Sequence, residues 1–217
     1  MVAQFFLLTP LIEDAEAFRP KLDALLETGV FSVVLLRFKA ANDARLKQMV
    51  PVLRERVQAK GVACLIECPD DPRLIARLEL DGAHISQHAA LAGAIEGLKP
   101  TRIIGVGGLR ARHDAMELGE KDIDYLMFGE PRADGSLPPL TQTLERAGWW
   151  AEVFTVPCVA YAPDMDALAP LAQTGTEFIA LGEWLFSGEN PAESAIEARR
   201  IAMHHARVIP MALDADA

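Results

Sequence analysis

With 217 residues, 51% of them hydrophobic, the chain is long enough to bury the core of one domain and leaves little room for a second. Its formal net charge of −10 argues against nonspecific binding to nucleic acid or anionic membranes, because both need a basic surface. No apolar run approaches the roughly 20 residues that cross a bilayer, and the N-terminal segment lacks the features of a signal peptide, so we expect a cytoplasmic protein without a membrane or nucleic-acid partner.

Eight short apolar runs recur along the chain, and each has the length of a buried strand. Helix-forming stretches separate them. Strands lose their polar face when helices cover one side and a barrel core covers the other. We therefore predict an α/β fold, a single-domain (β/α)8 TIM barrel over residues 1–207, with a flexible acidic tail over 208–217. In chain order the runs are FFLL, SVVLLR, ACLIEC, DGAHI, RIIGVGG, DYLMFG, PCVAYA and EFIALG.

A helical pattern follows each apolar run. In the first, Leu22, Leu25 and Leu26 share one face and Gly29 provides a stop. The last begins with Pro191, which suits a first helical turn. The predicted helices cover residues 14–28, 42–59, 72–80, 88–98, 110–119, 141–148, 165–174 and 191–207.

The segment 129–140, GEPRADGSLPPL, is the longest stretch without a strand or helix pattern. Its two glycines and three prolines resist regular structure, and its place after the sixth run puts it at the C-terminal rim of the barrel. It is either a mobile active-site loop, with Arg132 as its only cation, or an inert surface connection.

The functional residues of a parallel barrel lie where its strands end. Arg37 and Lys39 stand two residues apart, so they point the same way and either bind an anion together or face solvent as separate cations. Gly107 and Gly108 either let a phosphate approach backbone amides or form a tight turn. Together the strand ends favour a phosphorylated small-molecule ligand, with candidates Arg37, Lys39, Asp70, His84, Gln87, Gly107, Gly108 and Gly182.

The order and spacing of these segments resemble the thiamine phosphate synthase and thiazole tautomerase superfamily. QFFLLTP is similar to its first strand, GVFSVVLLRFK to its Gln-Leu-Arg-Glu-Lys strand, and DGAHISQ to its Asp-Gly-Val-His-Leu-Gly-Gln segment. The segments IGVGG, DYLMFGE, VPCVAYAP and EFIALGEWLF match the last four strands in order. The resemblance covers nearly the whole chain, and DGAHISQ is its most specific part.

The resemblance implies an enzyme that joins a hydroxymethylpyrimidine diphosphate to a thiazole phosphate with magnesium and releases pyrophosphate. Departure of pyrophosphate leaves a pyrimidine cation, so catalysis rests on magnesium and basic residues rather than on a protein nucleophile. The implied catalytic residues are Arg37, Lys39 and Gln87, and we add His88 as a titrating group because its position at a predicted helix start is partly exposed. The implied phosphate-binding residues are Arg37, Lys39, Gly107, Gly108, Arg132 and Gly182.

The magnesium ligand that the resemblance implies depends on how the segment is counted. Counting back from Asp81 places Asp70 on the family's aspartate, whereas counting forward from Gly61 places Cys68 there. We prefer Asp70, because carboxylates bind magnesium best just beyond a strand; a helix cap is its alternative role. Ala89 occupies the second ligand position and cannot bind a metal.

Other departures affect both halves of the implied site. Leu35 replaces a glutamine that orients the pyrimidine, and Leu109 replaces a histidine. Pro163 and Asp164 remove an amide donor and place a carboxylate against a phosphate. These changes predict weak synthase turnover. A thiazole tautomerase-like isomerase with His88 as proton carrier and a noncatalytic phosphate-binding barrel remain open, as does assembly into a homo-oligomer.

Overall fold

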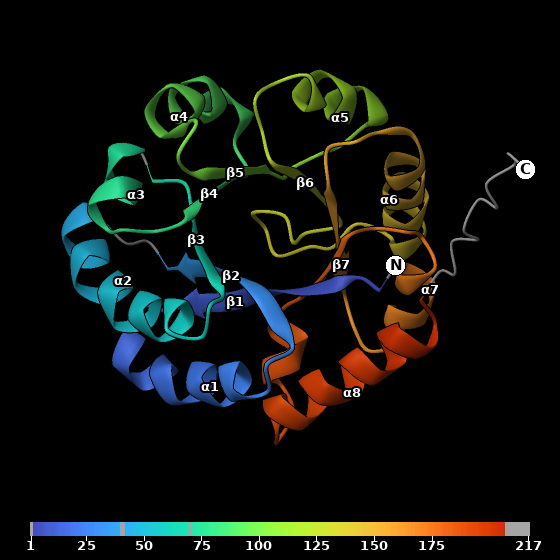
Figure 1. Ribbon diagram of the computed structural model, residues 1–217, viewed down its shortest axis with the longest axis horizontal. Coiled ribbons are helices and arrows are strands. Elements are labelled where there is room, and N and C mark those ends of the chain that lie inside the picture. Colours follow the sequence, from blue (N-terminus) through green and yellow to red (C-terminus); the bar gives the residue numbers. More distant parts are fainter. Residues whose placement is uncertain (1, 40–41, 70, 207–217) are drawn as a thin grey trace, which may run out of the picture.

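The computed structural model describes residues 2–39, 42–69 and 71–206. Eight parallel strands pair in sequence order and close into a barrel surrounded by helices (Figure 1), which confirms the predicted (β/α)8 fold. The predicted tail over 208–217 lies outside the described residues. The strands are β1 (Gln4–Ile12), β2 (Phe31–Phe38), β3 (Ala63–Glu67), β4 (Gly82–Ile85), β5 (Ile103–Val106), β6 (Tyr125–Phe128), β7 (Cys158–Ala162) and β8 (Phe178–Leu181).

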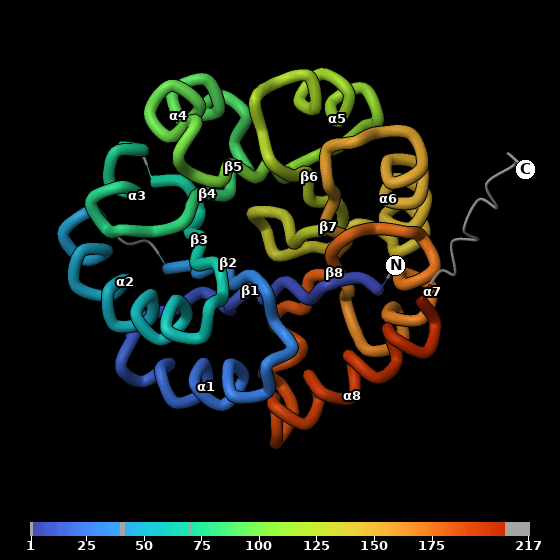
Figure 2. Tube along the Cα trace, in the orientation of Figure 1, coloured from blue at the N-terminus to red at the C-terminus, as the bar shows by residue number. Residues whose placement is uncertain are grey.

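The helices form the outer layer, and the tube in Figure 2 follows them around the ring from the blue N-terminal to the red C-terminal part of the chain. None of the described helices is both long and apolar enough to cross a bilayer. The helices are α1 (Ala15–Glu27), α2 (Asp43–Gln58), α3 (Arg73–Arg77), α4 (Leu91–Leu98), α5 (Arg112–Gly119), α6 (Leu140–Val153), α7 (Leu168–Ala172) and α8 (Pro191–His204), with short 3-10 helices η1 (His88–Ala90) and η2 (Glu183–Phe186).

Several helix boundaries differ from the sequence-based prediction. The stretch predicted as one helix over 88–98 begins as η1 and continues as α4, and η2 was not predicted. The sixth helix runs past Gly148 to Val153 because Trp150 is buried and its indole N–H donates to the carbonyl oxygen of Val156 at 2.7 Å. Tertiary packing thus overrides the local stop signal at the glycine.

Strand β1 closes the barrel, because it pairs with β2 on one edge and with β8 on the other. On one edge Phe5 is in register with Phe31 of β2, and on the other Gln4 is in register with Phe178 of β8. Both neighbours are parallel to β1, so the strands end at one face of the ring. That face is where functional side chains of such barrels collect.

Alternate residues of the strands point into the barrel and fill its centre. On β2 and β3 the last of these apolar residues are Leu35 and Leu65, so the next inward positions are Arg37 and Glu67. The apolar interior therefore gives way to charged side chains at the mouth. The interior cluster consists of Phe6, Leu8, Leu35, Leu65, Tyr125, Met127, Val159, Tyr161 and Ala180.

Two glycines make room for tyrosines of neighbouring strands inside the barrel. A β-carbon at Gly105 would lie 1.8 Å from Cζ of Tyr125, and one at Gly182 would lie 2.3 Å from the hydroxyl of Tyr161. Neither distance is compatible with a side chain larger than hydrogen. The glycines on β5 and after β8 thus leave room for both tyrosine side chains within the interior.

We predict that Gly105→Ala lowers the free energy of unfolding by about 1–3 kcal/mol, because the added methyl group overpacks the barrel against Tyr125. The control is Gly93→Ala on α4, where a β-carbon has nothing within 4 Å and alanine favours the helix by about 0.5–1 kcal/mol. Urea unfolding measures both. Equal midpoints for Gly105→Ala and the wild type would contradict the packing argument.

Candidate functional site

The carboxyl ends of the strands surround a cavity of about 1410 Å³, lined by residues within or just after all eight strands. Ligand pockets commonly measure roughly 300–1,000 Å³, so this cavity has room for two small molecules. The segment between β6 and α6, predicted to lie at the rim, extends inward at this mouth (Figures 1 and 2).

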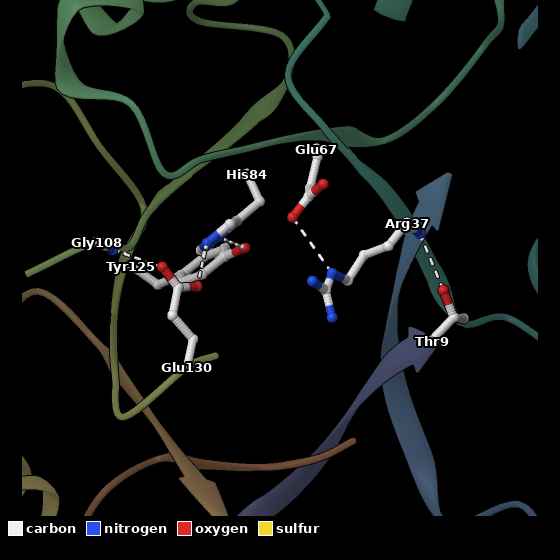
Figure 3. Close-up of polar contacts among 7 residues, drawn as sticks. All are labelled: Thr9, Arg37, Glu67, His84, Gly108, Tyr125 and Glu130. Carbon is white, nitrogen blue, oxygen red and sulfur yellow. Dashed lines mark hydrogen bonds and ion pairs between the residues drawn. The ribbon is translucent and has the colours of Figure 1, made fainter. Parts of the chain in front are cut away.

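Arg37 projects from the end of β2 into one wall of the cavity (Figure 3). Its backbone N–H donates to Oγ1 of the buried Thr9 at 2.9 Å, which fixes the end of the strand. Its side chain is 15% exposed, and its Nε donates to Oε1 of Glu67 at 3.3 Å. Within the part of the chain that the structure describes, its two terminal amino groups make no hydrogen bond, so they can bind an anion in the cavity.

Lys39 lines the rim of the same wall. Its Nζ lies 2.6 Å from Oε1 of Glu13, and both side chains are exposed. The hydrogen bond and the charge of Lys39 lower the pKa of Glu13. An exposed ion pair contributes little to stability, so a polyvalent anion can replace Glu13 as the partner of Lys39.

The opposite side holds a hydrogen-bonded chain, which we call the Glu130 network: the buried Tyr125 and His84, the partly buried Glu130 and the backbone of the exposed Gly108 (Figure 3). Nε2 of His84 lies 2.8 Å from Oε2 of Glu130, and the Gly108 N–H donates to the other oxygen, Oε1. Nδ1 of His84 lies 3.0 Å from the Tyr125 hydroxyl. The Glu130 side chain, 11% exposed, lines the cavity, and His84 lies behind it.

The hydrogen bonds of this network depend on the protonation of Tyr125 and Glu130 at its two ends. Burial raises the pKa of Tyr125 well above its usual range, and the charge of Glu130 adds to this, so the hydroxyl keeps its proton. Burial acts to raise the pKa of Glu130, but the His84 imidazole, the Gly108 N–H and the charge of Arg37 outweigh it and lower the pKa. Because an ionised carboxylate can only accept, Nε2–H of His84 donates to Glu130, and Nδ1 of His84 is hydrogen-bonded to the Tyr125 hydroxyl.

Comparison with known proteins adds independent evidence. A family model described as thiamine monophosphate synthase matches residues 5–184. The chain belongs to the thiamine monophosphate synthase family. The resemblance in the strand segments is thereby confirmed.

The relatives of this family that the chain matches cover it almost completely. It is 36% identical over 203 residues to the thiamine-phosphate synthase of Rhodospirillum centenum (strain ATCC 51521 / SW), covering 91% of this chain and 97% of that one. The corresponding protein of Erythrobacter litoralis (strain HTCC2594) is 31% identical over 210 residues, with 92% and 95% covered. The fold is similar to thiamine phosphate pyrophosphorylase from Pyrococcus furiosus, with a TM-score of 0.76 at 20% identity over 93% of this chain and 96% of that one.

The structure brings part of the predicted site together at the cavity. Gly107, His88 and Gly182 lie beside the cavity rather than among its lining residues. Nε2–H of His88 donates to the carbonyl oxygen of Gly107 at 2.8 Å, so this ring joins two loops. Asp70 lies outside the described residues. The predicted residues that line the cavity are Arg37, Lys39, Gln87, Gly108 and Arg132, with His84 on its inner side.

The two glycines after β5 have a visible structural role. A β-carbon at Gly107 would lie 2.1 Å from Oε1 of Glu130, and the N–H of Gly108 already donates to this oxygen. The Glu130 carboxylate thus lies where the sequence analysis expected these backbone amides to meet a phosphate.

Glu130 is the main feature of the site that the sequence analysis missed. The glutamate was visible in the segment DYLMFGE, directly after a strand and a glycine. Its importance follows from His84 and Gly108, which belong to other strand ends, so the local sequence carries no sign of it. Two cations that line the cavity were also missed: Arg110, and Arg146, whose Nη2 donates to the Arg110 carbonyl oxygen at 2.7 Å.

One predicted obstacle to phosphate binding is corrected by the structure. Asp164 was expected to oppose a phosphate after β7, but its Oδ1 accepts a hydrogen bond from the Ala167 N–H at 3.0 Å. The carboxylate therefore caps the turn that precedes α7 and is not part of the cavity lining. Pro163 does line the cavity, and because proline has no backbone N–H, this position offers no donor to a phosphate.

The donor set for a metal is incomplete in the described part of the chain, where no cluster of three or more His, Cys, Asp or Glu side chains could hold an ion. Glu67 pairs with Arg37, and Glu130 accepts hydrogen bonds from two donors. These carboxylates do not fit a resident magnesium site, since magnesium requires oxygen ligands that are free to surround it.

Because the pKa of Glu130 is lower in the folded protein than its ordinary value of 4.5, its ionised form stabilises the fold above that pH, and this contribution is lost as the pH falls below 4.5 toward the folded pKa. Glu130→Gln cannot titrate. We predict that the wild type is more stable than Glu130→Gln at neutral pH and that the difference narrows on acidification.

Urea unfolding across this pH range measures the difference. The exposed Glu145 on α6 provides a control, Glu145→Gln, for the loss of one negative charge. A difference between wild type and Glu130→Gln that stays constant down to the acid range would contradict the lowered pKa.

Proposed function

We propose that the protein is a thiamine phosphate synthase with slow turnover, which joins hydroxymethylpyrimidine diphosphate to thiazole phosphate and releases pyrophosphate. The observation that carries this proposal is Arg37, held at the mouth by Thr9 and Glu67 with its terminal amino groups open to a cavity large enough for two substrates. Membership of the thiamine monophosphate synthase family supports the same reaction.

In the proposed reaction, the bond between the pyrimidine methylene carbon and the diphosphate oxygen breaks, and its electron pair leaves with pyrophosphate. The lone pair of the thiazole nitrogen then forms the new carbon–nitrogen bond, and the positive charge ends on the thiazolium ring. No proton is removed from either substrate. The protein therefore needs charge stabilisation and positioning rather than a strong base.

Arg37 and Lys39 are the proposed diphosphate-binding pair. The guanidinium of Arg37 offers a planar fork, whereas Lys39 supplies a point charge at the rim. Gln87 lies in the cavity lining as a donor for a substrate oxygen. We assign the thiazole phosphate to the side of Arg132 and the backbone after Gly182, because the β6–α6 segment and the residues after β8 line the same cavity.

The resemblance to this family implies that magnesium takes part in the reaction. Because the described carboxylates do not fit a resident site, the steps proposed above are assigned to protein groups alone. Asp70, the magnesium ligand implied by the resemblance, lies outside the described residues.

Slow turnover is proposed because positioned contacts of the family are replaced in this chain. Ala89 cannot supply a metal ligand, the Leu109 side chain cannot donate a hydrogen bond, and Pro163 lacks an amide N–H. Loss of one positioned electrostatic contact typically costs about 10²- to 10³-fold in rate. His88 is expected to have no proton-carrying role in this reaction, because no proton is transferred.

We predict formation of thiamine phosphate from the two substrates with magnesium at a turnover below about 1 s⁻¹. Arg37→Ala should lower the rate by a further factor of about 10² or more, because the departing diphosphate loses its main cationic partner. The control is Arg56→Ala on α2, whose guanidinium is bound to Asp23 away from the cavity. Turnover well above 1 s⁻¹ would refute slow catalysis, and no product even at high enzyme concentration would refute the proposed activity.

Pyrophosphate alone is also expected to raise the melting temperature, since a ligand that binds only the folded state stabilises it. Arg37→Ala should abolish this rise, whereas Arg56→Ala should retain it, because Arg37 lines the cavity and Arg56 does not. Differential scanning fluorimetry with and without pyrophosphate measures the shift. Equal shifts in the wild type and Arg37→Ala would place the anion elsewhere on the protein.

A further inference from the structure

The mouth of the barrel holds two opposite charges, Arg37 and Glu130, on opposite strands. Arg37 comes from β2 and Glu130 follows β6, and these strands lie opposite each other in the closed order of eight. Figure 3 shows Arg37 pointing into the mouth from one wall and Glu130 lying beside His84 at the other. Both side chains line the same cavity, and the charge of Arg37 contributes to the lowered pKa of Glu130. Arg37 and Glu130 thus place opposite charges on opposite strand ends of the cavity, which Arg110, Arg132 and Arg146 also line.

The immediate surroundings of the Glu130 carboxylate are unsuited to a phosphate. The Gly108 N–H, which could otherwise bind an anion at this strand end, donates to Glu130. A phosphate beside this ionised carboxylate would meet electrostatic repulsion. A diphosphate substrate is therefore oriented with its phosphates toward Arg37 and its organic ring toward Glu130.

The Glu130 carboxylate keeps capacity for a ligand. Each oxygen has one described donor, His84 for Oε2 and Gly108 for Oε1, whereas an ionised carboxylate offers about four acceptor positions. The side chain is held in place by these bonds, and Gly107 leaves space for it. A fixed carboxylate of this kind can accept an N–H from a ring amino group and stabilise positive charge on the ring without reorganising.

We propose that Glu130 binds the aminopyrimidine ring of the diphosphate substrate and stabilises the cation that forms when pyrophosphate departs. This inference rests on the proposed function. As the bond between the methylene carbon and the diphosphate oxygen breaks, negative charge moves to the pyrophosphate near Arg37 and positive charge stays on the ring near Glu130. Arg37 thus stabilises the departing pyrophosphate, and Glu130 stabilises the pyrimidine cation. Glu130 neither gains nor loses a proton in this step.

Binding separates this role from the synthase activity itself. Isothermal titration should show that Glu130→Gln binds the pyrimidine diphosphate about tenfold more weakly than the wild type, because a charge-assisted hydrogen bond is lost. Affinity for inorganic pyrophosphate, which has no ring, should not fall. Glu145→Gln on α6 should bind both as the wild type does, since its side chain is exposed and lies outside the cavity lining.

Unchanged or tighter binding of the pyrimidine diphosphate by Glu130→Gln would overturn the proposal and would indicate that Glu130 merely occupies an anion site. Equal weakening for pyrophosphate would overturn it as well. If the wild type binds as expected but forms no thiamine phosphate, the proposed function fails while the ring-binding role of Glu130 stands. Should Glu130→Gln not fold, Glu130→Asp keeps the charge but withdraws it from His84 and Gly108, and the same ligand discrimination is expected.

The pH dependence of kcat distinguishes charge stabilisation from a structural role. Glu130→Gln should lower kcat by about 10²-fold. His84→Leu removes a donor while Glu130 remains buried, so the pKa of Glu130 should rise and the acid limb of kcat should move to higher pH. Among the described residues, Arg37 and the Gly108 N–H also lower the pKa of Glu130, and Tyr125 is the other hydrogen-bond partner of His84; all three are unchanged in the variant.

His84→Gln retains an amide N–H that can donate to Glu130. The acid limb of its kcat–pH profile should therefore lie closer to that of the wild type than the limb of His84→Leu does. Circular dichroism establishes that each variant is folded. An acid limb that stays at the same pH in all three proteins would overturn the proposed electrostatic role.

Discussion

The burial of one negative charge constrains the whole mouth of this barrel. A carboxylate in a low-dielectric site is costly unless donors surround it, and Glu130 obtains them from His84 and Gly108 on other strand ends. His84 in turn requires the Tyr125 hydroxyl, and the Tyr125 ring requires the absence of a side chain at Gly105. A chain of dependence therefore runs from the interior of the barrel to the surface of the cavity.

The ends of β2 and β6, on opposite sides of the barrel, carry side chains of opposite charge. Strand β2 carries one of the cations that line the cavity, Arg37, and the segment after β6 carries the fixed carboxylate of Glu130. In a reaction that separates charge, preorganised groups of both signs lower the barrier more than either alone, because each acts where its own kind of charge develops. The barrel holds them apart through rigid strands, which prevents the direct pairing of Arg37 with Glu130 that would cancel both.

Sequence reasoning succeeded where a physical rule is local. The strands were predictable because burial on both faces leaves continuous apolar runs, and Arg37 was predictable because alternation along a strand fixes where it points. It failed where partners come from distant segments. The role of Gly107 depends on Glu130, and the length of α6 depends on the burial of Trp150, so neither can be derived from neighbouring residues.

The pairing of β1 with β8 has a consequence for how the chain acquires its structure during synthesis. The first strand has one hydrogen-bonding edge that stays without its native neighbour until Phe178 and the residues after it have left the ribosome. Until then the nascent sheet has two open edges, on which other chains could pair. The cavity, whose wall includes the loop after β8, cannot close earlier, so ligand binding cannot assist any stage of folding before the last strand is in place.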